Sequence, residues 1–144
     1  MKIDVVCVGK IKEEFYRAAV DEYLKRLSRF AKVEVREIAE GKNLSEEGEN
    51  ILRAAKGKII ALCIEGKKLS SVQLADYVKT LCDNGDRFTF IIGSSCGLAD
   101  SVKNAAHLKL SFSDMTFPHQ LMRVVLLEQL YRSFMINGGG EYHK

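Results

Sequence analysis

Short apolar runs alternate with longer amphipathic segments along the whole chain. The apolar runs are rich in β-branched residues and bounded by glycine or polar residues, which is the pattern of buried strands. The third run is expected to stop at Glu65-Gly66-Lys67. Strands are therefore predicted at Lys2–Val8, Val33–Ile38, Lys58–Ile64, Arg87–Ile92 and Leu108–Phe112.

The segments between these runs have the apolar spacing of helices. Ser45 is predicted to cap the second helix and Ser70 or Ser71 the third, because a hydroxyl can accept a hydrogen bond from a free backbone N–H. Pro118 stands where the last helix would begin. Helices are expected at Glu14–Phe30, at Glu46–Lys56, from Ser70 or Ser71 to Leu81, at Asp100–Ala106, and from Pro118 to about Ile136.

Strands that alternate with helices indicate an α/β fold. Continuous apolar strands joined by helical crossovers imply a mainly parallel sheet with helices on both faces. No internal repeat or linker interrupts the pattern, so residues 1–144 are expected to form one domain.

The last helix is apolar around most of its circumference, from Leu121 to Met135. Such a helix is buried on more than one side, and a second copy of the chain is the simplest cover for the second side. Glu128 and Arg132 are spaced to pair on one face. Arg123 and Arg132 on this apolar helix indicate either contact with an anion or substrate, or pairing at an interface.

Composition narrows the class of protein. The net charge of +3, from 22 basic and 19 acidic residues, is too small for a protein that holds nucleic acid by charge alone. No apolar run approaches the length of a membrane span and no signal-peptide layout is present, so we expect a cytoplasmic protein. The four cysteines lack C-x-x-C spacing, which favours reduced core thiols, with Cys96 in a Gly/Ser turn as the exception. No residue spacing supports a metal site.

Two loops and the carboxyl-terminal segment could carry chemistry. Gly93–Gly97 follows a strand and precedes a helix; it could hold a ligand near free backbone N–H groups or could be only a tight turn. Ser111–His119 could line a pocket above the sheet or supply caps and turns. Tyr142 and His143 follow three glycines, which suggests a segment folded into a site.

These loops also carry a family resemblance. The series I-I-G-S-S-C-G-L, then L-S-F-S-D-M-T-F-P-H-Q-L-M-R-V-V-L-L-E-Q-L-Y-R, then Y-H-K, resembles the ribosomal RNA large subunit methyltransferase H family. The resemblance extends from the opening K-I-D-V-V-C-V-G-K through A-L-C-I-E-G-K to the end. Gly93-Ser94 departs from two adjacent glycines that are common in the family. A contact needing positive φ at Ser94 would be strained.

The resemblance implies a SPOUT-type fold with a deep carboxyl-terminal trefoil knot. Such a knot would stack three strand-end loops into a cleft for S-adenosylmethionine, without a metal. The residues implied to bind this cofactor are Leu62, Gly93, Ser94, Gly97, Ser113, Asp114, Met115, Thr116, Phe117 and Pro118.

The implied reaction moves a methyl group from S-adenosylmethionine to N3 of pseudouridine 1915 in 23S rRNA. His143 or Tyr142 would contact the target base, with His143 the better proton acceptor. Arg132 would stabilise the imide anion or a phosphate, and His119 would orient either ligand.

The implied partners are a second copy of the chain and 23S rRNA within the ribosome, with no DNA and no membrane. In a dimer, basic residues of the first helix (Arg17, Lys25 and Arg29) could grip rRNA.

Two other hypotheses stay open. The chain could be a ribosome-associated protein of the same fold that binds S-adenosylmethionine without transferring the methyl group. It could also be a flavodoxin-like protein with another nucleotide ligand, which the α/β alternation alone would allow.

Overall fold

The computed structural model describes residues 1–143. All its strands join one parallel sheet in the order β2-β1-β4-β3-β5, so the fold is the predicted α/β class. The strands are β1 (Lys2–Val8), β2 (Lys32–Ile38), β3 (Lys58–Lys68), β4 (Phe88–Ile92) and β5 (Leu108–Ser111). The helices are α1 (Glu14–Leu27), α2 (Leu44–Ala54), α3 (Ser71–Asp83), α4 (Asp100–Ala105) and α5 (His119–Asn137).

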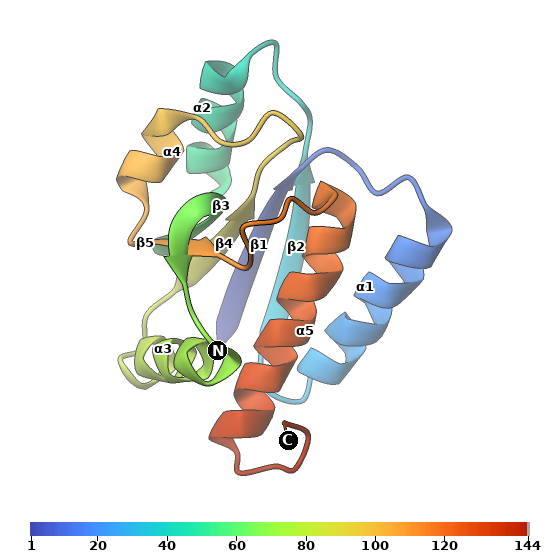
Figure 1. The fold of residues 1–144 in the computed structure, drawn as a ribbon, viewed down its shortest axis with the longest axis vertical. Helices are drawn as coiled ribbons and strands as arrows, with labels where there is room; N and C mark the ends of the chain where they lie inside the picture. The colour runs from blue at the N-terminus through green and yellow to red at the C-terminus, as the bar shows by residue number, and fades with distance from the viewer. Residues whose placement is uncertain (144) are drawn as a thin grey trace.

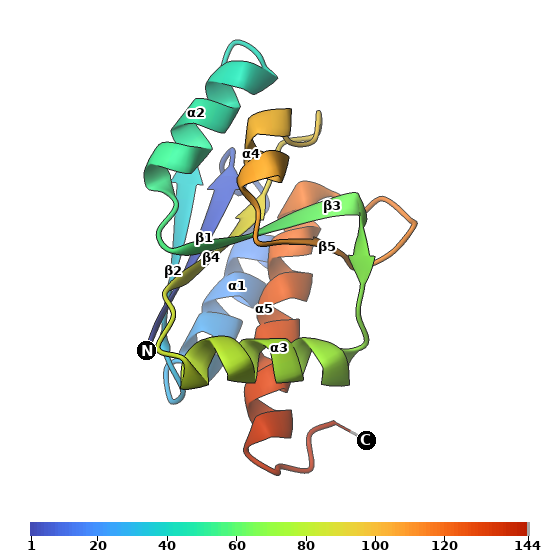
Figure 2. The same ribbon diagram turned by 90° about the vertical axis from the view of Figure 1, so that its left-hand side faces the viewer.

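The sheet is covered on both faces, as the continuous apolar strands predicted. Along β1, Ile3 and Val5 face a core shared with α1, α3 and α5, while Val6 and Val8 face a smaller core shared with α2 and α4. Figures 1 and 2 show these two helical layers on opposite sides of the sheet.

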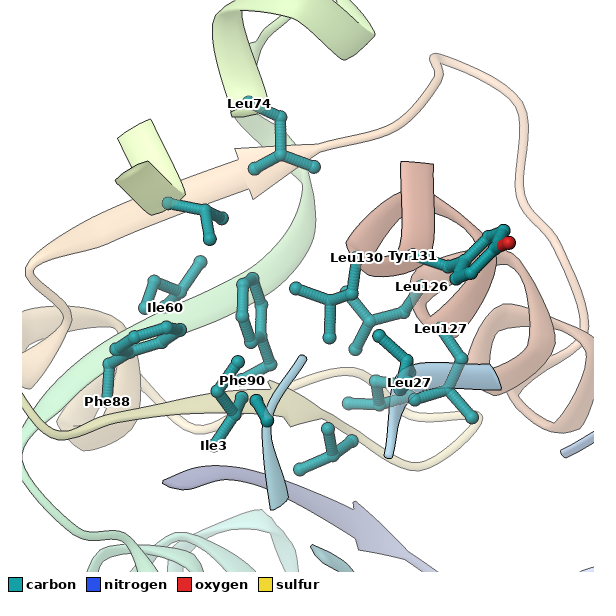
Figure 3. Close-up of a cluster of buried hydrophobic side chains, with 14 of the residues drawn as sticks. Ile3, Leu27, Ile60, Leu74, Phe88, Phe90, Leu126, Leu127, Leu130 and Tyr131 are labelled. Atoms are coloured by element: carbon teal, nitrogen blue, oxygen red, sulfur yellow. The ribbon is translucent and has the colours of Figure 1, made fainter. Parts of the chain in front are cut away.

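The last helix, α5, is enclosed largely by its own chain. It lies between α1 and α3 above the sheet (Figure 1). Leu126, Leu127 and Leu130 are fully buried and point toward the sheet residues Ile3 and Phe90 (Figure 3). Leu121, Val124, Val125 and Met135 are only partly buried, so packing within one chain covers part of the apolar circumference of α5, and the second copy that the sequence pattern suggested stays a prediction.

The prediction that β3 stops at Glu65-Gly66-Lys67 was wrong. The strand continues to Lys68, with a register shift after Leu62, and its end pairs with β5. At Gly66 a Cβ atom would lie 2.7 Å from the carbonyl oxygen of Lys109, so only glycine permits this close approach. The second half of β3 is thereby held against β5.

Several helix ends differ from the prediction for local reasons. Asn43, and not Ser45, caps α2, because its side chain accepts from the Glu46 N–H at 2.9 Å. The expected cap Ser70 is confirmed and forms a capping box with Gln73. Helix α1 ends at Leu27, whose carbonyl oxygen accepts two N–H groups of the turn into β2. The remaining differences at helix ends are one or two residues.

The cysteines are all free thiols, and Cys7 is fully buried. Burial raises the pKa of the Cys7 thiol to about 12. Within residues 1–143, none of the helices combines the length and apolar character that a membrane crossing requires.

Candidate functional site

A cleft of about 530 Å³ lies at the carboxyl ends of β3, β4 and β5. We call it the strand-end cleft. Ligands of open α/β sheets bind at this edge, and pockets of about 300–1,000 Å³ hold small molecules. Its walls come from the loops after β4 and β5 and from the start of α5. Many of the side chains that line it are apolar, among them Leu62, Ile92, Leu98, Leu110, Phe112 and Met122.

The structure brings together most of the residues that the sequence singled out for a cofactor. Asp114 is the exception, since its carboxylate pairs with Lys68 and it does not line the cleft. His119 also lines the cleft, at the first turn of α5. The predicted residues that line it are Leu62, Gly93, Ser94, Gly97, Ser113, Met115, Thr116, Phe117 and Pro118.

Backbone contacts shape the loop after β4. A Cβ atom on Gly93 would lie 2.5 Å from the Gly97 carbonyl oxygen and 2.8 Å from Leu98 Cδ2, so the loop closes only on a glycine. The Gly97 N–H donates to the Ser94 carbonyl oxygen at 2.9 Å, and Gly97 has a φ of +88°. The tight turn expected here thus forms one wall of a cleft.

Ser94 fits this loop without strain, because no residue other than glycine in the described chain has positive φ. Its hydroxyl donates to Glu47 Oε1 at 3.1 Å, and Glu47 Oε2 accepts the Gly41 N–H at 3.1 Å. Glu47 is only 7% exposed. The buried Glu47 carboxylate of α2 therefore holds the cleft loop through Ser94, the residue that stands where a second glycine was expected.

The loop after β5 is held by its own serines. The Ser111 hydroxyl donates to the Ser113 carbonyl oxygen at 3.1 Å, and the Met115 N–H donates to Ser113 Oγ at 2.9 Å. Met115 is 74% exposed at the rim of the cleft. Ser113 therefore stabilises the turn, as predicted if this loop supplies caps and turns. The same loop also lines the cleft.

One ion pair spans the cleft wall. Lys103 Nζ of α4 lies 2.6 Å from Glu65 Oε1 of β3, and both residues line the cleft. The hydrogen bond from Lys103 holds the pKa of the Glu65 carboxyl below its usual range. Neither residue carries a sequence motif that indicates a role in the site.

The start of α5 is tied to the opposite edge of the sheet by Arg123. This side chain is 1% exposed; its Nη1 donates to Glu37 Oε2 at 2.6 Å and its Nη2 to the Gly9 carbonyl oxygen at 2.7 Å. Both proposed roles for Arg123, anion contact and interface pairing, are therefore wrong, because the guanidinium is used inside the chain. Burial alone would raise the pKa of Glu37, but the Ile11 N–H and Arg123 hold it below its usual value.

A second polar group lies at the far end of α5. We call it the carboxyl-terminal cluster: Glu128, Arg132, Tyr142 and His143. Arg132 donates to both Glu128 oxygens, at 3.1 and 3.2 Å, which confirms the predicted helix-face pair. Its guanidinium also lies 4.7 Å from the Tyr142 ring centroid and 3.0 Å from His143 Nδ1. The carboxyl-terminal segment is thus folded onto α5.

The carboxyl-terminal cluster shifts the pKa of Tyr142. The Tyr142 hydroxyl donates to Glu128 Oε1 at 2.7 Å. This hydrogen bond, together with burial and the charge of Glu128, raises the pKa of Tyr142 to about 12. Arg132 Nη1 also lies 3.0 Å from His143 Nδ1, so the imidazole is in direct contact with the guanidinium.

The structure does not bring this cluster to the strand-end cleft of the same chain. His119 and Arg132 are 13 positions apart on one helix, which corresponds to about 20 Å along its axis. Figure 1 shows the segment that follows α5 at the opposite end of this helix from its start. The predicted cofactor residues and the predicted base-contacting residues therefore form two separate groups in one chain.

Comparisons with known proteins agree on one family. The sequence profile described as "Predicted SPOUT methyltransferase" matches residues 1–143. A protein of Bifidobacterium animalis subsp. lactis, named Ribosomal RNA large subunit methyltransferase H, is 49% identical over 159 aligned positions. Proteins with the same name from Clostridium novyi and Clostridioides difficile are each 45% identical. These three alignments cover the whole of both chains.

Proposed function

This chain belongs to the SPOUT methyltransferase family, and we propose that it methylates N3 of pseudouridine 1915 in 23S rRNA with S-adenosylmethionine as the donor. The observation that carries the proposal is the strand-end cleft, which gathers nearly all residues expected to bind the donor. Relatives at 45–49% identity bear the name of this rRNA methyltransferase.

The residues of the cleft fit the donor chemically. Apolar side chains such as Leu62 and Leu110 suit the faces of an adenine ring, and the loops after β4 and β5 offer backbone groups for its edge. The absence of a side chain at Gly93 keeps the loop closed around the cleft. A charged pair, Glu65 and Lys103, provides the polar part of the wall.

Bound S-adenosylmethionine supplies a methyl group on a sulfonium sulfur; a bond from N3 to this carbon forms as the carbon–sulfur bond breaks. The protein must position the base and accept the N3 proton, a task that contributes about 10²–10⁴-fold when a base lies within reach. We assign proton acceptance to His143, whose Nδ1 lies 3.0 Å from Arg132 Nη1. Tyr142 stays protonated and contacts the target base, Arg132 stabilises the imide anion, and His119 orients the ligands.

The separation of about 20 Å along α5 supports a site shared between two copies of the chain. We propose a homodimer in which the carboxyl-terminal cluster of one subunit completes the strand-end cleft of the other. A two-fold arrangement of this kind would form two equivalent sites. Mixing two inactive variants tests it: one lacks Tyr142–Lys144 and the other carries Gly93→Ala. Restored methyl transfer in the mixture supports a shared site, whereas two dimeric but inactive partners would refute it.

Substrate recognition is proposed to depend on shape more than on charge. The net charge of +3 is small, and the exposed face of α1 carries Asp21 beside the basic residues Arg17 and Lys25, with exposed Arg29 in the turn that follows the helix. We therefore propose rRNA within the assembled ribosome, and not free RNA or DNA, as the substrate, and the cytoplasm as the place of action. We also propose the trefoil knot, supported by the membership of the chain in the SPOUT family.

The direct test measures transfer of radiolabelled methyl groups to ribosomes from cells that lack this gene, followed by mass spectrometry of rRNA nucleosides. We expect one new N3-methylated pseudouridine. Deletion of Tyr142–Lys144 should leave binding of S-adenosylmethionine within about 3-fold of wild type and abolish transfer. Donor binding without any transfer by the intact protein would instead support a ribosome-associated binding protein.

A further inference from the structure

Two charged side chains stand out in the strand-end cleft. Of the residues that line it, Glu65 and Lys103 are the ones that carry a full charge at neutral pH. They come from different elements, the second half of β3 and the middle of α4, and their charged atoms are 2.6 Å apart. Glu65 lies in the part of β3 where the register against β5 shifts, between Leu62 and Lys67.

This ion pair contributes little to stability. The Glu65 side chain is 54% exposed and that of Lys103 is 26% exposed, and water and salt screen such pairs strongly. Among the described residues, neither charge forms an ion pair with any other side chain. The pair can therefore exchange partners at small cost when a ligand brings charges of its own.

Resting on the proposed function, we infer that Glu65 and Lys103 bind the amino-acid end of the methyl donor. The Lys103 ammonium pairs with the donor's α-carboxylate, and the Glu65 carboxylate pairs with its α-ammonium. One ion pair within the protein is replaced by two between protein and ligand, so every charge stays partnered. The rest of the cleft wall cannot do this, because its other side chains are apolar, uncharged or, at His119, a single imidazole.

Two thioether ligands separate this role from adenosine binding. S-Adenosylhomocysteine has the amino-acid end, and 5′-methylthioadenosine lacks it while keeping the adenosine and the sulfur. Calorimetry with both ligands measures the contribution of the amino-acid end directly. Lys103→Met should weaken S-adenosylhomocysteine binding by about 10–100-fold, as expected for loss of a hydrogen bond to a charged group, and leave 5′-methylthioadenosine within about 2-fold.

The matched control is Lys109→Met, which removes the same charge from β5 close to Glu65 but outside the cleft lining. This variant should bind S-adenosylhomocysteine within about 2-fold of wild type. Thermal unfolding of each variant confirms that it is folded. Glu65→Gln should show the same ligand dependence as Lys103→Met, with no effect on 5′-methylthioadenosine.

The exchanged double variant, Glu65→Lys with Lys103→Glu, is the decisive measurement. It keeps an ion pair but reverses its direction, so a merely structural pair would restore wild-type binding. We expect S-adenosylhomocysteine binding to stay weak and 5′-methylthioadenosine binding to be retained. Restored binding, or equal losses for both ligands in Lys103→Met, would overturn this inference alone. A wild-type protein that binds neither ligand would overturn the proposed function.

Discussion

Replacing Arg123 by methionine should destabilise the fold by about 3 kcal/mol, because breaking a buried ion pair costs about 3–5 kcal/mol. Arg123 is 1% exposed and makes two short contacts, at 2.6 Å to Glu37 and 2.7 Å to the Gly9 carbonyl oxygen. The lower end of the range applies, since the Glu37 side chain is 29% exposed and can be partly rehydrated. Methionine fills most of the apolar volume of the arginine stem.

The assay is urea denaturation of Arg123→Met, Glu37→Gln and the double variant. A loss of about 3 kcal/mol corresponds to a fall of about 6–12 °C in Tm for a domain near this size. The two residues are in contact, so the double variant should be more stable than additivity predicts, by at least about 1 kcal/mol. Arg53→Met is the control: this exposed arginine contacts Asn50 and should change stability by less than about 0.5 kcal/mol.

The same pair predicts a pH dependence. The pKa of Glu37 is below its ordinary value of 4.5, so its folded form holds the proton less tightly than the unfolded chain does. The stabilisation is therefore present above that value and is lost as pH falls through the lower pKa of the folded state. Arg123→Met should show a smaller loss of stability on acidification. Wild-type stability in Arg123→Met, or additive effects in the cycle, would refute the reasoning.

Three further substitutions have defined outcomes. Gly93→Ala places a Cβ atom 2.5 Å from a backbone oxygen and should weaken S-adenosylmethionine binding by at least about 10-fold, whereas the neighbouring Ser95→Ala should not; calorimetry would measure both. Ser94→Gly leaves buried Glu47 without its hydroxyl donor. It should lower the free energy of unfolding, measured by urea denaturation, by about 1–3 kcal/mol. An unchanged denaturation midpoint would contradict a stabilising role for the Ser94–Glu47 hydrogen bond. Tyr142→Phe should remove one phenol that titrates near pH 12 in alkaline absorbance titrations; the stability from its hydrogen bond is present below its ordinary value of 10 and is lost as pH rises toward 12.

The fold was largely predictable because the apolar runs of the sequence coincide with the buried strands of the sheet. Runs such as Lys2–Val8 and Lys58–Ile64 are short and β-branched, and both became central strands. The end of β3 was missed because Glu65, Gly66 and Lys67 look like a polar turn, and their strand character depends on pairing with a β5 segment more than 40 positions away. Local spacing carries no information about such a partner.

The cleft was predictable from loop composition, but its polar contacts were not. Ser94 and Gly97 could be placed from the strand–glycine–helix pattern, whereas Glu47 as the partner of Ser94 could not, being 47 positions away. Arg123 shows the limit most clearly. An arginine on an apolar helix has the same local pattern whether it binds a substrate or a distant carboxylate, and here its partner Glu37 is 86 positions away.

The sheet order has a consequence for synthesis of the chain. β1 lies inside the sheet, with β2 on one side and β4 on the other, so the first strand made cannot acquire its second neighbour until Ile92 has emerged. At about 5–20 residues per second, the delay after β2 is on the order of 3–10 s. During that time the backbone edge of β1 that later pairs with β4 is unpaired, which exposes it to wrong strand pairing.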